Sequence, residues 1–186
     1  YYNKPMQEGL YRHYKAIAES VDLPQILYNI PGRTGVNMLP STVAKLCGLQ
    51  NIVGIKEGSG SVQQASEIVS TCGDRITVLA GDDALTLPMM AVGGKGVISV
   101  TSNIVPSQMA QLVQAFLSSR IDEARRIHSA LSPLFNALFY ETNPIPVKTA
   151  LGLMGKIDPE LRLPLCAMAA ETKDKLTRVL KDAGLI

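Results

Sequence analysis

Lys56, at the end of a short apolar run, is the residue of this chain best suited to covalent chemistry. The run reads Asn-Ile-Val-Gly-Ile-Lys-Glu over residues 51–57 and leads into Gly-Ser-Gly. Such a run, rich in β-branched residues and followed by glycines, is typical of a buried parallel strand. At a strand end, lost hydration favours the neutral amine, which can attack a carbonyl carbon and form a Schiff base. The alternative is a lysine that extends into solvent or pairs with Glu57.

Polar residues collect at or just after the end of each of four predicted strands, at 25–30, 51–57, 76–80 and 97–100. They are Tyr28 and Arg33, Lys56 and Glu57, Asp82 and Asp83, and residues 101–103. Ligands of parallel α/β folds bind at the carboxyl ends of the strands, so one pocket could hold all of these residues. We expect Asp82 and Asp83 to be loop and capping residues, not an acid and a base.

The strands alternate with predicted helices at 6–20, 40–47, 62–71 and 85–92. After residue 106 the pattern predicts helices alone, at 108–118, 121–140, after the proline-rich stretch 143–148, and at 167–183. A repeating strand and helix predicts a parallel sheet. No glycine-rich phosphate-binding fingerprint follows any strand.

A complete barrel has eight strands and about 250 residues. We therefore predict an α/β fold that is the C-terminal half of a (β/α)8 TIM barrel with a C-terminal helical extension. Residues 1–105 would be the second half of the barrel, and residues 106–186 its last helix and the extension. The chain begins with Tyr1 and no methionine, and we expect it to be part of a longer protein.

The composition excludes several classes of function. The 186 residues are 46% hydrophobic and carry a formal net charge of +2, without a basic block that would indicate a nucleic acid or an anionic membrane as partner. No apolar run approaches the length of about 18 residues that predicts a membrane span. Cys47, Cys72 and Cys166 lie far apart among helix-like residues. We expect reduced core thiols in a cytoplasmic protein, and no metal site.

Two motifs at this separation resemble the signature of the dihydrodipicolinate synthase and N-acetylneuraminate lyase family of class I aldolases. They are Tyr-Asn-Ile-Pro-Gly-Arg-Thr-Gly at 28–35 and Gly-Ile-Lys-Glu at 54–57. The resemblance extends through residues 1–5, 79–83, 96–100 and 143–148, and so covers the whole chain. It implies that Lys56 corresponds to the lysine that forms the Schiff base.

The resemblance also implies roles for two tyrosines and an arginine. Tyr28 matches the proton-relay tyrosine, although a core tyrosine is the structural alternative. Tyr2 matches a tyrosine that the relay takes from a neighbouring subunit, which implies a homo-oligomer, a dimer or a tetramer. Arg33 matches the arginine with which the synthases of the family hold a carboxylate of the aldehyde substrate. A planar guanidinium suits bidentate carboxylate binding.

Gly81 and Ile98 match positions whose main-chain carbonyls lie near the substrate. With these residues the resemblance implies a lyase that condenses pyruvate with L-aspartate 4-semialdehyde, in lysine and diaminopimelate biosynthesis. Such a lyase needs no cofactor, because the imine itself withdraws electrons. The family's Gly-Thr-Thr-Gly-Glu loop, which supplies a relay threonine and binds the pyruvate carboxylate, is absent from this sequence. We therefore expect impaired activity from this chain alone.

Two alternatives stay open. The first is an inactive half-barrel that serves as a scaffold or an oligomerisation fragment. The second is a sialate or sugar-acid lyase of the same family, against which Arg33 argues because those lyases generally carry other residues at this position. Removing part of a barrel also leaves sheet edges unpaired, which favours association with another chain.

Overall fold

A computed structural model describes all residues of the chain, Tyr1 to Ile186. The chain forms two compact units, Tyr1–Ile98 and Ser99–Ile186. None of its helices combines the length and the apolar character that crossing a lipid bilayer requires.

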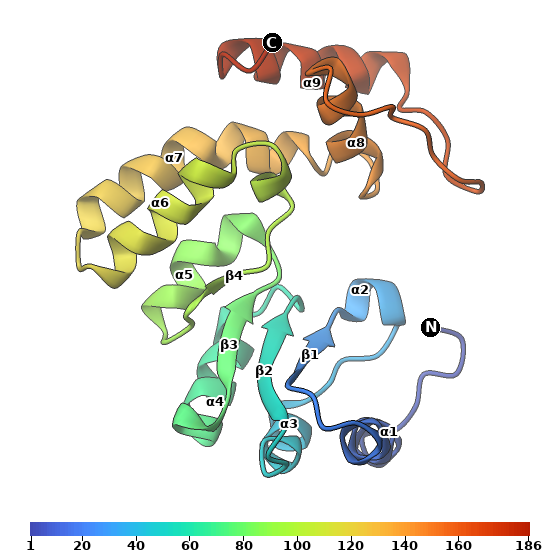
Figure 1. The fold of residues 1–186 in the computed structure, drawn as a ribbon, viewed down its shortest axis with the longest axis vertical. Helices are drawn as coiled ribbons and strands as arrows, with labels where there is room; N and C mark the ends of the chain where they lie inside the picture. Colours follow the sequence, from blue (N-terminus) through green and yellow to red (C-terminus); the bar gives the residue numbers. More distant parts are fainter. The chain divides into compact units, whose positions relative to one another are not determined.

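The first unit alternates helices with strands. Its elements are α1 (Gln7–Ser20), β1 (Gln25–Asn29), α2 (Pro31–Thr34), α3 (Pro40–Leu46), β2 (Ile52–Glu57), α4 (Val62–Cys72), β3 (Thr77–Ala80), α5 (Thr86–Ala91) and β4 (Gly96–Val97), with short 3-10 turns before β3 and α5. The four strands lie side by side in the order β1-β2-β3-β4 and are all parallel (Figure 1). The predicted α/β architecture with a four-stranded parallel sheet is confirmed.

Helices cover one face of this sheet. Leu27, Ile55, Val78 and Ala80 alternate with residues of the other face, and each is at most 2% exposed. They form one apolar cluster with buried residues of α1, α3, α4 and α5. Burying a leucine, isoleucine or valine side chain contributes about 1.5 to 3 kcal/mol. The core of the unit is therefore the layer between the sheet and these helices.

Helix boundaries in this unit have local causes. Ser61 caps α4, because its side chain accepts a hydrogen bond of 3.0 Å from the Gln64 backbone N–H. Gly73, with a φ of 57°, ends the same helix in a conformation that glycine adopts readily. Pro40 occupies the first turn of α3, where a missing N–H leaves no hydrogen bond unmade.

Two local features were not predicted. Residues 31–35, which lie between the predicted strand 25–30 and the predicted helix 40–47, contain the one-turn helix α2 (Pro31–Thr34), which Gly35 caps with a φ of 73°. The fourth strand was expected to reach residue 100, but β4 ends at Val97. Ser102 N–H donates to the Ser99 hydroxyl at 2.8 Å, and this local turn replaces continued pairing.

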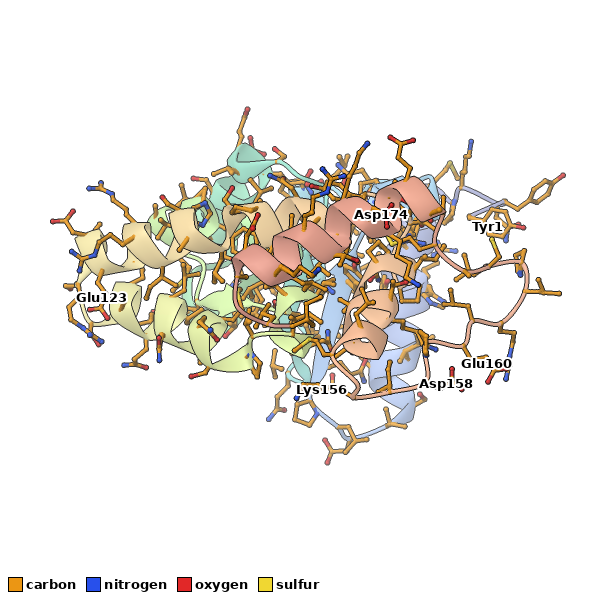
Figure 2. The ribbon with its side chains drawn as sticks, turned by 90° about the horizontal axis from the view of Figure 1, so that it is seen from above. Tyr1, Glu123, Lys156, Asp158, Glu160 and Asp174 are labelled. Atoms are coloured by element: carbon orange, nitrogen blue, oxygen red, sulfur yellow. The ribbon has the colours of Figure 1, made fainter.

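The second unit contains helices and no strand. Its elements are a 3-10 turn (Thr101–Asn103), α6 (Pro106–Leu117), α7 (Ile121–Ala137), α8 (Ile145–Leu153) and α9 (Ala170–Asp182). The long connection between α8 and α9 carries Lys156, Asp158 and Glu160, which Figure 2 labels. The last helix begins at Ala170 and not near residue 167, so Cys166 lies on this connection and is exposed. The expectation of a core thiol is therefore wrong for Cys166, whereas Cys47 and Cys72 are buried and free.

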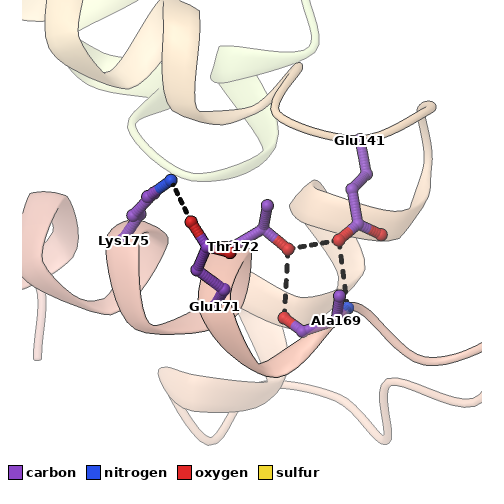
Figure 3. A network of polar contacts seen from close by, with 5 residues as sticks. All are labelled: Glu141, Ala169, Glu171, Thr172 and Lys175. Carbon is purple, nitrogen blue, oxygen red and sulfur yellow. Dashed lines mark hydrogen bonds and ion pairs between the residues drawn. The ribbon is translucent and has the colours of Figure 1, made fainter.

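A carboxylate from the α7–α8 connection holds the start of α9. Glu141 Oε1 accepts hydrogen bonds from the Ala169 backbone N–H, at 3.0 Å, and from the Thr172 hydroxyl (Figure 3). A negative group at a helix N-terminus satisfies a free N–H and interacts favourably with the helix dipole. Glu141 thus joins two segments that lie far apart in the sequence.

Candidate active site

The lysine and a tyrosine singled out from the sequence are direct neighbours in the sheet. In the parallel pairing of β1 with β2, Tyr28 is the register partner of Lys56. Lys56 Nζ lies 4.2 Å from the centroid of the Tyr28 ring, a distance typical of a cation–π contact. The structure therefore brings an amine and a phenol together near the carboxyl ends of two strands, where a reacting carbonyl compound could meet both.

Both side chains belong to the face of the sheet that the unit's helices leave open. Tyr28 is 40% exposed and Lys56 is partly buried. Ile26 shares this face and is 50% exposed. A cavity of about 480 Å³ opens beside Tyr28, between residues of α1, β1 and the N-terminal segment. Within the first unit, Tyr28 is thus accessible to small molecules, and Lys56 Nζ lies beside its ring.

The other predicted binding residues lie around the same strand ends. Arg33 is in the last turn of α2, shortly after β1, and is exposed. Gly81 follows β3, and its N–H donates to the Glu57 carbonyl at 2.7 Å. Ile98 follows β4, and its N–H donates to the Ala80 carbonyl at 3.0 Å. These backbone bonds extend the sheet ladder past the ends of the strands.

Gly81 lies in a tight place. A Cβ atom there would be 2.8 Å from Gly58 Cα and 2.9 Å from the Glu57 carbonyl oxygen. Both are backbone atoms, so a larger residue would push the end of β2 away from β3. The glycine is therefore required for the close approach of these two strand ends.

Tyr2 is not brought to the Lys56 site within this chain. It lies in the N-terminal segment before α1 and is 87% exposed, and Figure 2 marks its neighbour Tyr1 at this end of the chain. An exposed tyrosine at this place is available for contacts with another chain.

Glu57 is buried, and the sequence did not indicate its structural role. It points to the helix-covered face, opposite to Lys56, and is 0% exposed. Its carboxylate accepts hydrogen bonds from Asn29 Nδ2, Gln64 Nε2 and the Ser59 backbone N–H. The anticipated alternative, an ion pair of Lys56 with Glu57, is therefore not formed. The alternation of side chains along a strand was the signal that could have placed these two residues on opposite faces.

The chain contains no group of three or more histidine, cysteine, aspartate or glutamate side chains arranged to hold a metal ion. What the site offers chemically is an amine nucleophile, a phenol that can transfer a proton, and a guanidinium suited to carboxylates.

Comparison with known proteins places this geometry in a family. The model of the dihydrodipicolinate synthetase family matches residues 1–183. A protein from Geotalea daltonii named 4-hydroxy-tetrahydrodipicolinate synthase is 61% identical over 186 residues, which are 100% of this chain and 64% of the relative.

Solved structures agree with this match. Dihydrodipicolinate synthase from Aquifex aeolicus superposes with a TM-score of 0.98 at 50% identity, covering 100% of this chain and 64% of that one. The chloride-inhibited enzyme from Acinetobacter baumannii, solved with pyruvate, superposes with a TM-score of 0.97 at 46% identity and the same coverage. The chain thus spans somewhat less than two thirds of the length of its relatives.

This coverage corrects the predicted fold class. The chain is not the C-terminal half of a barrel, because it matches 64% of the length of the relatives and of their structures. The prediction rested on counting four strands of the eight in a barrel. Residues 99–186 add helices and no strand, so the count of strands understated the share of the whole. What the structure supports is an α/β fold, a four-stranded parallel sheet with helices.

Proposed function

Because the chain belongs to the dihydrodipicolinate synthetase family, we propose that it carries the imine-forming site of a 4-hydroxy-tetrahydrodipicolinate synthase. The reaction is the condensation of pyruvate with L-aspartate 4-semialdehyde, in lysine and diaminopimelate biosynthesis. One observation carries the proposal: Lys56 Nζ lies 4.2 Å from the Tyr28 ring, on the open face and near the carboxyl ends of neighbouring parallel strands.

Lys56 acts as the nucleophile. Its neutral amine attacks the ketone carbon of pyruvate, and loss of water leaves an imine whose cationic form withdraws electrons. A proton then leaves the methyl carbon, which becomes the nucleophilic carbon of an enamine. This carbon attacks the aldehyde carbon of the second substrate and forms the new C–C bond. The amino group of the second substrate then attacks the imine carbon, which closes the ring of the product and displaces the amine of Lys56.

Tyr28 transfers protons in these steps. Its side chain lies beside Lys56 Nζ, so its hydroxyl could reach the carbinolamine oxygen that must leave as water and the alkoxide that the aldehyde becomes. Arg33, exposed after β1, binds a carboxylate of the aldehyde substrate. The main-chain carbonyls of Gly81 and Ile98 line the substrate site from the ends of the next strands.

Tyr2 completes the relay of a second copy of the chain. The proposal is supported by its exposure of 87% on the N-terminal segment. The working form is then a homo-oligomer in which each site takes a hydroxyl from its neighbour. All three cysteines are free thiols, which suits the reducing cytoplasm, and we place the enzyme there.

The test is to trap the imine. The chain is incubated with pyruvate and sodium borohydride, which reduces an imine to a stable amine, and the products are analysed by intact mass and peptide mapping. We expect a single pyruvate-derived adduct on Lys56. Lys56→Arg removes the adduct, because a guanidinium does not form the imine, whereas Lys45→Arg, an exposed change on α3, leaves it unchanged.

Two results would overturn the proposal. The first is a folded chain that gives no adduct, which would favour a scaffold without chemistry. The second is an adduct spread evenly over the exposed lysines, which would mean that Lys56 has no special reactivity. Adding aspartate semialdehyde before the borohydride should lower the yield of adduct, because the second substrate consumes the enamine.

A further inference from the structure

A buried carboxylate lies directly behind the Lys56 site and has no cationic partner. Glu57 Oε2 accepts hydrogen bonds from Asn29 Nδ2 at 3.1 Å and Gln64 Nε2 at 3.0 Å. Its Oε1 accepts from the Ser59 backbone N–H at 2.6 Å and more weakly from Asn29 Nδ2 at 3.3 Å. Both oxygens of a side chain that is 0% exposed are thus occupied by neutral donors.

The donors are themselves held in place. Asn29 Nδ2 also donates to Asn37 Oδ1 at 2.7 Å, and Asn37 Nδ2 donates to Gln64 Oε1 at 2.8 Å. Asn29 Oδ1 accepts from the Met38 backbone N–H at 2.9 Å. These contacts close a ring of three amide side chains around the carboxylate. Fully satisfied networks of this kind are rigid, because every rotation breaks a hydrogen bond in a low dielectric.

The network is tied to the reactive pair by the sheet register. Asn29 pairs with Glu57, and the preceding register pair is Tyr28 with Lys56. Side chains of adjacent strand residues point to opposite faces, so the network and the reactive pair lie back to back on the same two strand ends. The Ser59 N–H joins the loop after β2 to the same carboxylate.

We propose that Glu57 is a positioning residue for the Schiff-base chemistry, acting with Asn29 and Gln64. By holding the ends of β1 and β2 and the loop after β2 in one geometry, it keeps the Tyr28 ring against Lys56. It does not touch the substrate. This inference rests on the proposed function for its catalytic consequence, while its geometric part stands on the contacts above.

Holding two strands together does not by itself explain a buried carboxylate. A well-packed apolar pair would hold them without the loss of hydration that a buried charge suffers. A carboxylate also fixes orientation, because its two oxygens accept from three donors at once and so set the angle at which each donor lies. Reacting groups that are misplaced by about 1 Å can lose a hundredfold in rate, so a fixed orientation matters most beside a reactive pair.

The test compares Glu57→Gln with Glu141→Gln. At Glu57, one oxygen becomes an NH₂ group, which faces either the donors of Asn29 and Gln64 or the Ser59 N–H, so the network cannot close in either orientation. Glu141 accepts both of its hydrogen bonds through Oε1, which a glutamine retains, and serves as the matched control. We expect the rate of pyruvate trapping at Lys56 to fall about tenfold or more in Glu57→Gln and to be unchanged in Glu141→Gln.

A variant that exchanges the donor and the acceptor between residues 57 and 64 separates an effect on the position of Lys56 from a general loss of stability. In Glu57→Gln combined with Gln64→Glu, the amide and the carboxylate change places along the 3.0 Å contact. We expect this double variant to recover part of the trapping rate, because the contact with residue 64 is restored while Asn29 Nδ2 still faces the new NH₂ group. If Glu57→Gln does not fold, Gln64→Met removes one donor and should give a smaller loss of the same kind.

A second readout does not depend on pyruvate. The Tyr28 ring shifts the NMR signals of the Lys56 ε-methylene group, which Lys56→Arg assigns in a sample with ¹³C-labelled lysine. The shift should disappear in Glu57→Gln as in Tyr28→Leu, persist in Glu141→Gln and return in part in the exchange variant. If it persists in a folded Glu57→Gln variant, the positioning role is wrong. If the wild-type chain traps no pyruvate, the proposed function fails, and this signal still decides the geometry.

Discussion

The molecule contains two glutamates that hold segments together, one in each unit, and they do so in different ways. Glu57 is completely buried and uses both carboxylate oxygens, accepting from three donors. Glu141 is partly exposed and uses one oxygen for both of its bonds (Figure 3). Water can replace the partners of Glu141, whereas nothing can replace those of Glu57. The same type of side chain thus makes contacts that water can replace at the start of α9, and contacts that nothing can replace in the buried network at the end of β2.

The largest difference should appear in stability when each glutamate becomes glutamine. Glu57→Gln is expected to lower the free energy of unfolding by about 3 kcal/mol, because a buried network around a charge is broken. Glu141→Gln should lower it by less than about 0.5 kcal/mol, since its accepting oxygen remains. Urea denaturation followed by circular dichroism measures both. Equal losses would mean that burial does not distinguish the two carboxylates.

A smaller effect is expected when the Glu57 region is disturbed through the backbone. In Gly81→Ala the new Cβ would lie 2.9 Å from the Glu57 carbonyl oxygen, so the strand end must shift. We expect a loss of about 2 kcal/mol, which is typical of overpacking, together with slower imine trapping.

The control for this variant is Gly32→Ala in α2, where a Cβ would meet no atom within 4 Å. It should leave both the unfolding free energy and the trapping rate close to wild type. A Gly81→Ala variant that behaves like Gly32→Ala would show that the two strand ends tolerate a wider separation, and would weaken the argument that their geometry is critical.

The smallest effect on stability is expected from the pH dependence of a buried, uncharged thiol, that of Cys72. Burial, and then the hydrogen bond with Cys47, raises the pKa of Cys72 from its ordinary value of 9.0 to about 12. Above pH 9 the unfolded chain loses this proton while the folded chain keeps it, so stability falls as the pH rises from 9 to about 12. At pH 10 we expect a loss of about 1 kcal/mol relative to pH 8. Urea titrations of wild type and Cys72→Ala at a series of pH values isolate this loss. The prediction is contradicted if the unfolding free energies of the two proteins fall equally between pH 8 and pH 10.

Much of the local structure followed from the sequence. Hydrophobic periodicity, proline at helix starts and glycine at helix ends placed the helices and strands of the first unit, apart from α2 and the length of β4. Both exceptions depend on short hydrogen-bonded turns, which compete with regular structure over too few residues to leave a periodic signal.

The share of the complete fold that this chain represents was harder to infer from the sequence. Counting strands measured only the sheet, so the share of a barrel was misjudged, and Cys166 was assigned to a helix that begins only at Ala170. Helical segments outside the sheet carry no information about how many strands the complete fold has. Comparison with longer relatives was needed to correct this.

The sequence by itself determined the chemistry available to this protein: an amine at the end of one strand, a phenol near the end of another, and a guanidinium in the turn that follows. It did so because residue type and local periodicity are properties of short segments. Tertiary structure alone decided that Tyr28 pairs with Lys56 and that Asn29, Asn37 and Gln64 meet around Glu57. Those contacts depend on strand register and helix packing, which join residues that no local pattern relates.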